Sequence, residues 1–326
     1  MQLSHARADG GARFFYPHDG ARSVQVTGSF CGWRTPGRTL DRGEHGFLGD
    51  VEGLPAGDVE YKLVVDGRWL PDPQNLSRRP DGRGGENSVL HRGGRGAIHH
   101  RAFHAPSLGA SRGYVVYLPP GHASSRRRFP TLYLLHGALD GEKTWLDKGN
   151  LAGAMDRLHA EGAVGDMIVI MPRDNGELCR GDGRFADYLA RDLVGHVDHD
   201  YPTLAAPGHR ALDGLSTGGF TSVVLGASRS HVWGSIGSMS GCHDERTFAT
   251  LHGHAAALRA SGQRYRISCG LGEPHIETCR AVTRELRQRE IAAEHAEAPG
   301  IHDWPLWREG LAGHLRFHWD NVRPRG

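Results

Sequence analysis

Ser216 is the residue whose surroundings most clearly indicate chemistry. Residues 214–219 have the sequence Gly-Leu-Ser-Thr-Gly-Gly, which fits the Gly-x-Ser-x-Gly pattern of a nucleophile elbow, a sharp turn between a strand and a helix. The glycines matter because such a turn is strained and crowded, so that side chains there would collide with the neighbouring strand and helix. A second match at residues 109–113 precedes an expected strand instead of a helix. The sequence therefore favours Ser216 as a nucleophile.

A serine nucleophile needs a general base and an acid that orients the base. In α/β-hydrolases these follow the serine in the order acid, then histidine, on loops after later strands. His302 is the candidate base, although with 22 histidines in the chain it could also be a histidine at a helix N-terminus without catalytic duty. Glu273, after the expected strand 265–269, is the candidate acid; the alternative is a glutamate favoured by a helix dipole. Asp244 and Asp303 are rivals, and the choice among the three carboxylates stays open.

The oxyanion of a tetrahedral intermediate is usually bound by two backbone N–H groups. One belongs to the residue after the nucleophile, which is Thr217 here. The other comes from the loop after an earlier strand, where residues 134–138 have the sequence Leu-Leu-His-Gly-Ala. We therefore expect Ala138 to be the second donor, although His-Gly is also common in ordinary turns that end a strand.

The elements that would position these groups belong to the second of two expected domains. Residues 12–92 contain short alternating runs separated by turn signals, and Asp66-Gly67 indicates a tight hairpin. Regular strand spacing without a helical period predicts a small β-sandwich. A stretch rich in glycine and arginine, residues 92–96, is the expected linker. We place the β-sandwich at residues 1–95 and the second domain at residues 96–326.

The second domain alternates strands with helices. Strands are expected at 113–118, 131–135 and 167–171, and helices at 151–160, 185–197, 277–291 and 304–315. This alternation predicts an α/β fold in which helices cover both faces of a mostly parallel, doubly wound sheet.

The composition of the chain limits the kinds of molecule that we expect it to bind. A net charge of +2 gives no indication of nucleic-acid binding. The sequence contains no run of about 18 apolar residues, so we expect no membrane span. The N-terminus lacks the apolar segment of a signal peptide, so we expect a cytoplasmic protein. The histidine pairs His99-His100 and His196 with His199 have no evident third ligand, so no metal or other cofactor is predicted. Homodimer formation stays open.

Residues from about 110 to 318 resemble the esterase group of α/β-hydrolases that includes feruloyl esterases, esterase D and enterochelin esterases. The matching segments are 132–137, 214–219, 269–270 and 300–304, with Trp307 following. The resemblance implies a catalytic triad of Ser216, Glu273 and His302. Two positions depart from the family pattern, because an aspartate is usual at Glu273 and a small residue is usual at Asp213.

The first domain resembles the glycogen-binding, family 48 carbohydrate module, an immunoglobulin-like β-sandwich. The matching segments are 27–33, 61–62, 65–69, 72–73 and 86–88. The resemblance implies that Trp33 and Trp69 stack on sugar rings, whose C–H faces are apolar, and that Lys62 and Asn87 bind hydroxyl groups. The alternative is a module that only packs against its enzyme.

Together these features predict a serine carboxylic ester hydrolase that forms an acyl-enzyme without a cofactor. The expected substrate is a small-molecule ester, either an acylated carbohydrate or an ester of an aromatic, feruloyl-type acid. A polysaccharide or oligosaccharide is a further possible partner. A cytoplasmic enterochelin esterase is the first alternative. A glucan-binding protein with an inert hydrolase domain is the second, and acyl transfer to a sugar would use the same residues.

Overall fold

The computed structural model describes residues 4–7, 10–17, 20–55, 57–75, 78–92, 96–120, 122, 125, 127–174 and 183–324. The chain divides into two compact units, Met1–Ala102 with Val115–Arg126, and Phe103–Tyr114 with Arg127–Gly326. Within the described ranges, no helix combines the length and the apolar character needed to cross a membrane.

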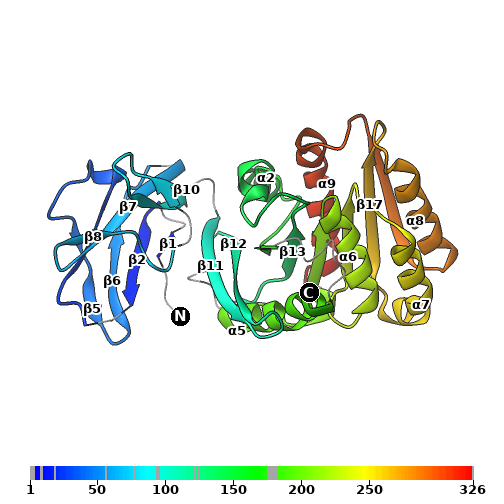
Figure 1. Cartoon of the computed structure of the whole chain (residues 1–326), viewed down its shortest axis with the longest axis horizontal. Coiled ribbons are helices and arrows are strands. Elements are labelled where there is room, and N and C mark those ends of the chain that lie inside the picture. Colours follow the sequence, from blue (N-terminus) through cyan, green and yellow to red (C-terminus); the bar gives the residue numbers. More distant parts are fainter. Residues whose placement is uncertain are drawn as a thin grey trace. The chain divides into compact units, whose positions relative to one another are not determined.

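The first unit is built from β-strands, as its alternating sequence predicts (Figure 1). One sheet has the order β1-β2-β6-β5 and the other the order β4-β3-β7-β10-β9, with β8 paired to β7. The strands are β1 (His5–Ala6), β2 (Ala12–Pro17), β3 (Val24–Gly28), β4 (Arg38–Thr39), β5 (Asp41–Gly43), β6 (Gly46–Val51), β7 (Gly57–Val65), β8 (Arg68–Leu70), β9 (Arg78–Pro80) and β10 (Glu86–Arg92). The predicted hairpin at Asp66-Gly67 is confirmed, because Val65 pairs with Arg68 and both turn residues have positive φ angles.

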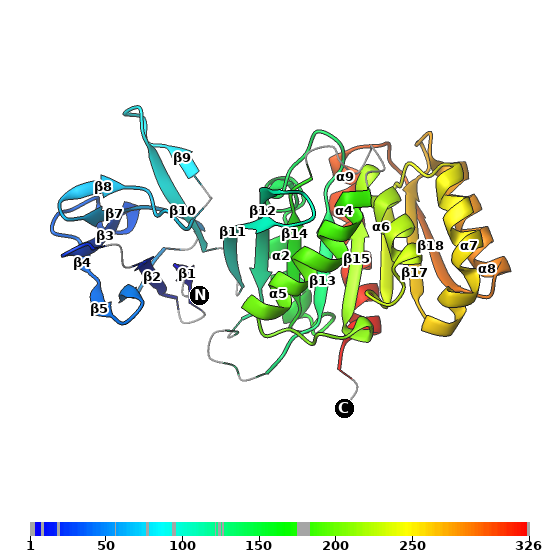
Figure 2. The ribbon, with the colours of Figure 1, turned by 60° about the horizontal axis from the view of Figure 1, so that its bottom comes forward.

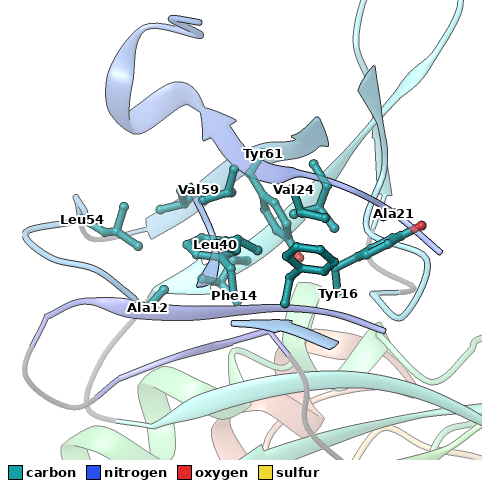
Figure 3. Close-up of a cluster of buried hydrophobic side chains, with 13 residues drawn as sticks. Ala12, Phe14, Tyr16, Ala21, Val24, Leu40, Leu54, Val59 and Tyr61 are labelled. Carbon is teal, nitrogen blue, oxygen red and sulfur yellow. The ribbon is translucent and has the colours of Figure 1, made fainter. Parts of the chain in front are cut away.

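Both sheets of this unit contribute to one hydrophobic core (Figure 3). Alternate residues of a strand face the same side, and the residues that enter this core alternate along their strands. They include Ala12, Phe14 and Tyr16 of β2, Val24 and Val26 of β3, and Val59, Tyr61 and Leu63 of β7. The rings of Phe14 and Tyr61 meet edge to face at 4.9 Å between centroids.

A third sheet has eight strands in the order β11-β12-β14-β13-β15-β16-β17-β18, and Figure 2 shows it with its helices. These are β11 (Ala97–Ala105), β12 (Ala110–Leu118), β13 (Thr131–Leu135), β14 (Ile168–Pro172), β15 (Arg210–Gly214), β16 (Ser235–Met239), β17 (Arg264–Gly270) and β18 (Ala292–Ala298). The pairs from β14 through β13 and β15 to β18 are parallel. Their carboxyl ends therefore lie along one edge, where loops that carry chemistry can meet.

Helices cover both faces of this sheet. Ser235 of β16 hydrogen-bonds to His318 of α9 (Trp304–Val322), whereas a Cβ on Gly226 of α6 (Thr217–Ser228) would lie 2.5 Å from Ile236. Since consecutive strand residues face opposite sides, α9 and α6 lie on opposite faces. The other helices are α1 (Thr144–Asp147), α2 (Leu151–Ala160), α4 (Gly183–Asp187), α5 (Val194–Asp200), α7 (Glu245–Ser261) and α8 (Ile276–Gln288).

The four predicted helices occur, but their bounds differ in places, and the structure has a further long helix; α8, for example, ends at Gln288 and not at residue 291. The expected helix 185–197 is α4 followed by a π-helical segment, Tyr188–Leu193, and by α5. Helix α7 was not predicted, because its buried stripe of Thr247, Leu251, Ala255 and Leu258 contains only two strongly apolar residues. The helix expected at 304–315 begins as predicted and extends to Val322.

Candidate active site

Ser216 lies at the turn between β15 and α6, in the order that an elbow requires. Its backbone has φ +53° and ψ −118°, a region that costs a non-glycine residue roughly 1–3 kcal/mol and persists only when its surroundings enforce it. Backbone hydrogen bonds hold the turn: the Ser216 amide donates to the Met239 carbonyl at 2.9 Å, and the Ser216 carbonyl accepts from the Phe220 amide at 3.0 Å and from the Cys242 amide at 3.4 Å. The strained turn lifts the hydroxyl group above the carboxyl edge of the sheet.

The glycines around Ser216 are required by close backbone contacts. A Cβ on Gly214 would lie 2.6 Å from the carbonyl carbon of Gly218, and one on Gly218 would lie 2.5 Å from the carbonyl oxygen of His136. A Cβ on Gly219 would lie 2.7 Å from Ser238 Oγ. Each distance is shorter than real Cβ contacts, so the crowding that the sequence predicts is present at all three positions.

His302 meets Ser216 across 86 residues of sequence, with 3.0 Å between Nε2 and Oγ. It lies on the loop between β18 and α9. That loop is fastened to the loop after β17, because the Gly272 amide donates to the Gly300 carbonyl at 2.9 Å. The imidazole is therefore placed by backbone contacts as well as by its own hydrogen bonds.

Glu273 lies behind His302 with its side chain completely buried. Its Oε2 accepts a hydrogen bond from His302 Nδ1 at 2.7 Å, and its Oε1 accepts from Ser240 Oγ at 2.5 Å and from the Gly270 amide at 3.0 Å. Burial alone would raise the pKa of this carboxyl group, but the hydrogen bonds outweigh burial and hold the pKa below its ordinary value. Glu273 is therefore a carboxylate near neutral pH.

The two rival carboxylates have other partners. Asp244 is the N-cap of α7 and accepts from the Arg246 amide at 2.9 Å. Asp303 is the N-cap of α9 and accepts from the Leu306 amide at 3.4 Å. Glu273 is thus the predicted acid that the structure brings to His302.

The predicted oxyanion donors lie beside Ser216. A Cβ on Gly137 would be 3.3 Å from Ser216 Cβ, so the loop after β13 touches the elbow. Within the part of the chain that the structure describes, the amides of Ala138 and Thr217 have no hydrogen-bond acceptor in the protein. Both N–H groups are therefore available to a bound oxygen atom.

His136 fixes the peptide that carries one of these donors. Its Nε2 accepts a hydrogen bond from the Asp174 amide at 3.0 Å, which leaves Nδ1 to donate to the Gly137 carbonyl at 2.8 Å. That carbonyl belongs to the same planar peptide as the Ala138 N–H group, so holding the oxygen atom also fixes the direction of the N–H group. Sequence reasoning assigned no role to this histidine, because its partner Asp174 lies 38 residues further along the chain.

Two more residues at the site were missed by sequence reasoning. Trp307 Nε1 donates to Ser240 Oγ at 2.9 Å, and Ser240 in turn donates to Glu273. The Trp307 ring also meets the ring of His302 edge-on at 4.9 Å between centroids. No local pattern identifies these contacts, although Trp307 stands in the segment that resembles the esterases.

Asp213 lies directly before the elbow in a fully buried cluster. Its Oδ2 accepts from His314 Nδ1 at 2.7 Å and from His318 Nε2 at 2.8 Å. Burial opposes its charge, but the two histidines hold the pKa of Asp213 far below its usual range. Among the described residues, these three form the one cluster with the composition of a metal site, and the earlier histidine pairs are not part of it. Tetrahedral zinc ligands would lie about 3.3 Å apart, so hydrogen bonds account better for the observed spacing.

The structure brings together some of the residues that the resemblance implies for sugar binding. Trp33 and Trp69 stack with 6.4 Å between ring centroids and 29° between planes, and Trp69 is 44% exposed. Lys62 is paired with Asp81 at 2.6 Å and lowers the pKa of that carboxyl group to about 2. Asn87 donates to Glu60 at 2.7 Å. The rings form a platform, while the two polar residues are engaged within the protein.

Two family models match the chain. The family described as "Putative esterase" matches residues 105–318, and "Glycogen recognition site of AMP-activated protein kinase" matches residues 12–91. An endo-1,4-beta-xylanase/feruloyl esterase of Xylanibacter ruminicola is 28% identical over 262 residues, which are 72% of this chain and 35% of that protein. The chain thus spans about a third of the length of this curated relative.

Solved structures show the same fold. A ferulic acid esterase matches with a TM-score of 0.63 and 20% identity, over 69% of this chain and 98% of its own. The enterobactin esterase from Shigella flexneri matches with a TM-score of 0.60 and 15% identity, over 98% of this chain and 94% of its own. These likenesses show a hydrolase fold of the esterase type that follows a β-rich N-terminal region.

Proposed function

Because the chain belongs to the "Putative esterase" family, we propose that it is a serine carboxylic ester hydrolase that works through an acyl-enzyme on Ser216. One observation carries this proposal: Ser216 Oγ, the His302 imidazole and the Glu273 carboxylate form one chain of hydrogen bonds, 3.0 and 2.7 Å long. This is the arrangement that activates a serine hydroxyl group. We further propose that the first unit is an immunoglobulin-like sandwich and that the catalytic sheet is mostly parallel and doubly wound.

The first half of the reaction follows from the protonation states. Glu273, as a carboxylate, accepts a hydrogen bond from His302 Nδ1–H and so keeps the proton on Nδ1, which leaves the Nε2 lone pair facing Ser216. His302 removes the hydroxyl proton as Oγ attacks the ester carbonyl, and the resulting oxyanion is bound by the N–H groups of Thr217 and Ala138. The intermediate collapses, His302 returns the proton to the leaving alcohol, and the acyl group stays on Ser216.

The second half repeats these steps with water. His302 Nε2 takes a proton from water, whose oxygen attacks the acyl-enzyme carbonyl, and the same two N–H groups bind the new oxyanion. Collapse breaks the bond to Ser216 Oγ, which recovers its proton from His302, and the carboxylic acid leaves. The serine and histidine end in their starting states, so the cycle needs no cofactor.

We propose a feruloyl-type ester, such as a hydroxycinnamoyl group on a carbohydrate, as the substrate. The support is the relative whose name includes feruloyl esterase and a first unit of the glycogen-recognition family. A catechol siderophore ester is the second candidate, favoured by the match to the enterobactin esterase over 98% of this chain, both units included. Product analysis with a feruloylated oligosaccharide and with a cyclic catechol triester separates the two.

We propose that the Trp33 and Trp69 platform binds a sugar chain by stacking. If the protein were a glucan-binding protein with an inert hydrolase unit, it would bind polysaccharide while Ser216 failed to react with a fluorophosphonate. The hydrogen bond from Ser216 to His302 argues for a reactive serine.

The experiment that tests the function is Ser216→Ala, assayed with 4-nitrophenyl acetate and methyl ferulate. Loss of a triad member costs about 10⁴-fold or more in kcat, so we expect activity to fall to background. Ser111→Ala, in the other Gly-x-Ser-x-Gly match, is the matched control and should keep wild-type activity. Retained activity in Ser216→Ala would exclude the proposal.

A further inference from the structure

Three large apolar side chains of the second unit are exposed to solvent. They are Leu139, Leu271 and Ile301, with relative exposures of 106%, 54% and 60%. Among the residues that the structure describes in this unit, these are the large apolar residues classed as exposed. A single exposed leucine has little meaning, but these three lie on the loops that carry Ala138, Glu273 and His302.

Each of the three is close in sequence to a catalytic group. Leu139 follows the oxyanion donor Ala138, and Ile301 directly precedes His302. Leu271 lies two residues before the acid Glu273. Since neighbouring Cα atoms are about 3.8 Å apart, the backbone of each of the three residues lies within one or two Cα–Cα steps of a residue of the proposed catalytic machinery.

Contacts between the loops bring these positions toward Ser216. The Gly272 amide bonds to the Gly300 carbonyl, and a Cβ on Gly272 would lie 3.2 Å from Ile301 Cγ2, so Ile301 packs beside the Leu271 loop. On the other side, the loop that leads to Leu139 touches Ser216 through Gly137. Leu139 itself has φ +65°, an unfavourable conformation for leucine, and its side chain is fully exposed.

We propose that Leu139, Leu271 and Ile301, which we call the apolar rim, bind an apolar group next to the scissile bond of the ester. This inference rests on the proposed function and gives its substrate a chemical class: esters with an aromatic or extended alkyl group beside the carbonyl or the ester oxygen, in preference to small acetyl esters. Exposed apolar side chains on loops around a site are typical of a binding surface. Here the covering partner is the substrate, because no rim residue lies more than two positions from a catalytic group.

The test is a chain-length series measured as kcat/KM. One arm varies the acyl group from 4-nitrophenyl acetate through butyrate to hexanoate, and the other varies the alcohol from methyl through butyl to hexyl butyrate. Each methylene removed from water adds up to about fourfold in binding, so we expect kcat/KM of the wild type to rise along at least one arm. Leu139→Ser, Leu271→Ser and Ile301→Ser should lower the long-to-short ratio along that arm, by about tenfold when combined.

The matched control is Leu204→Ser. Leu204 is a half-buried leucine in the segment before β15, and its amide bonds to Phe129 just before β13. It therefore lies at the end of the sheet opposite Ser216, and its variant should keep the wild-type ratio. Because the rim residues are exposed, their variants should also keep the wild-type melting temperature.

The outcomes separate the two proposals. If Ser216-dependent hydrolysis is present but the rim variants keep the wild-type ratio in both arms, the apolar rim has no role in specificity and the inference is wrong. If neither arm shows hydrolysis that depends on Ser216, the proposed function itself fails. A lowered ratio in the acyl arm or in the alcohol arm supports the inference and identifies the side of the ester that the rim contacts.

Discussion

Replacing Glu273 by glutamine should nearly abolish catalysis while leaving the shape of the site unchanged. The reason lies in the donors around the carboxylate. Oε1 accepts hydrogen bonds from Ser240 Oγ and from the Gly270 amide, so the oxygen atom of the new amide must take this position. The amide NH₂ group must then face His302 Nδ1, where it can only donate.

That donation selects the wrong tautomer of His302. Nδ1 becomes an acceptor, the proton moves to Nε2, and Nε2 can no longer accept the proton of Ser216. The corresponding change in a serine protease triad lowers kcat by about 10⁴-fold, which is about 5.4 kcal/mol of transition-state stabilisation. We expect a similar loss here, with KM changed little because Glu273 is buried behind the imidazole and does not contact the substrate.

The assay is the steady-state hydrolysis of 4-nitrophenyl acetate, with fluorophosphonate labelling of Ser216 as an independent readout. Asp244→Asn is the matched control, because asparagine is also a good N-cap and α7 should persist with full activity. A Glu273→Gln enzyme that kept activity within about tenfold of wild type would show that the carboxylate does not set the tautomer of His302, and the assignment of the acid would be wrong.

Three further predictions concern the elbow, the platform and acid stability. Gly218→Ala places a Cβ 2.5 Å from the His136 carbonyl oxygen. We expect this variant to be inactive and its free energy of unfolding, measured in urea, to fall by about 1–3 kcal/mol. Gly253→Ala is the control, because Gly253 has open space around it, and it should not destabilise the protein. Trp69→Ala should weaken glucan binding measured by affinity electrophoresis without changing hydrolysis of 4-nitrophenyl acetate, and unchanged glucan binding would contradict the platform. His243 is buried. Its pKa is lowered to about 3, mainly because burial disfavours the charged form and to a smaller extent because His275 repels it. In the unfolded state this histidine has a pKa of about 6.5 and gains a proton first as the pH falls, so the free energy of unfolding falls by about 1.4 kcal/mol per pH unit from pH 6.5 toward 3. In His243→Gln, the free energy of urea unfolding should therefore decline less steeply than in the wild type between pH 6.5 and 4.5. A slope equal to that of the wild type would refute the assignment.

The sequence pointed to Ser216 and His302 through local patterns, and the family resemblance selected Glu273 among three candidate acids; the structure joins these three residues by hydrogen bonds. The elbow around Ser216 requires glycines at fixed positions, and a strand followed by a loop precedes both Glu273 and His302. The same holds for β13 and α2, whose bounds match the prediction, since their apolar residues are numerous and regularly spaced. Local patterns of this kind survive folding because backbone sterics and burial act on the same residues.

The contacts that support the catalytic chain could not be predicted in this way. Ser240 lies 33 residues from Glu273 and 67 from Trp307, and only the folded sheet brings the three together. The apolar rim is similar: an exposed leucine in a loop has no distinctive sequence context, and its meaning appears only when the loop that carries Leu139 is found to touch Ser216 through Gly137. Periodicity indicates which residues are buried, but it cannot indicate which loops converge.

Asp213 shows how a departure from a family pattern can be balanced at a distance. A carboxylate buried beneath the nucleophile would be strongly unfavourable unless it were paired. The pairing comes from α9, where His314 and His318 are four residues apart and therefore on one helix face, so both reach the same oxygen atom. Asp213 Oδ1 also accepts from the Gly214 amide at 2.7 Å, at the first residue of the elbow. The helix that begins just after His302 is thus fastened by its later turns to the strand that delivers Ser216, which couples the placement of the base to that of the nucleophile.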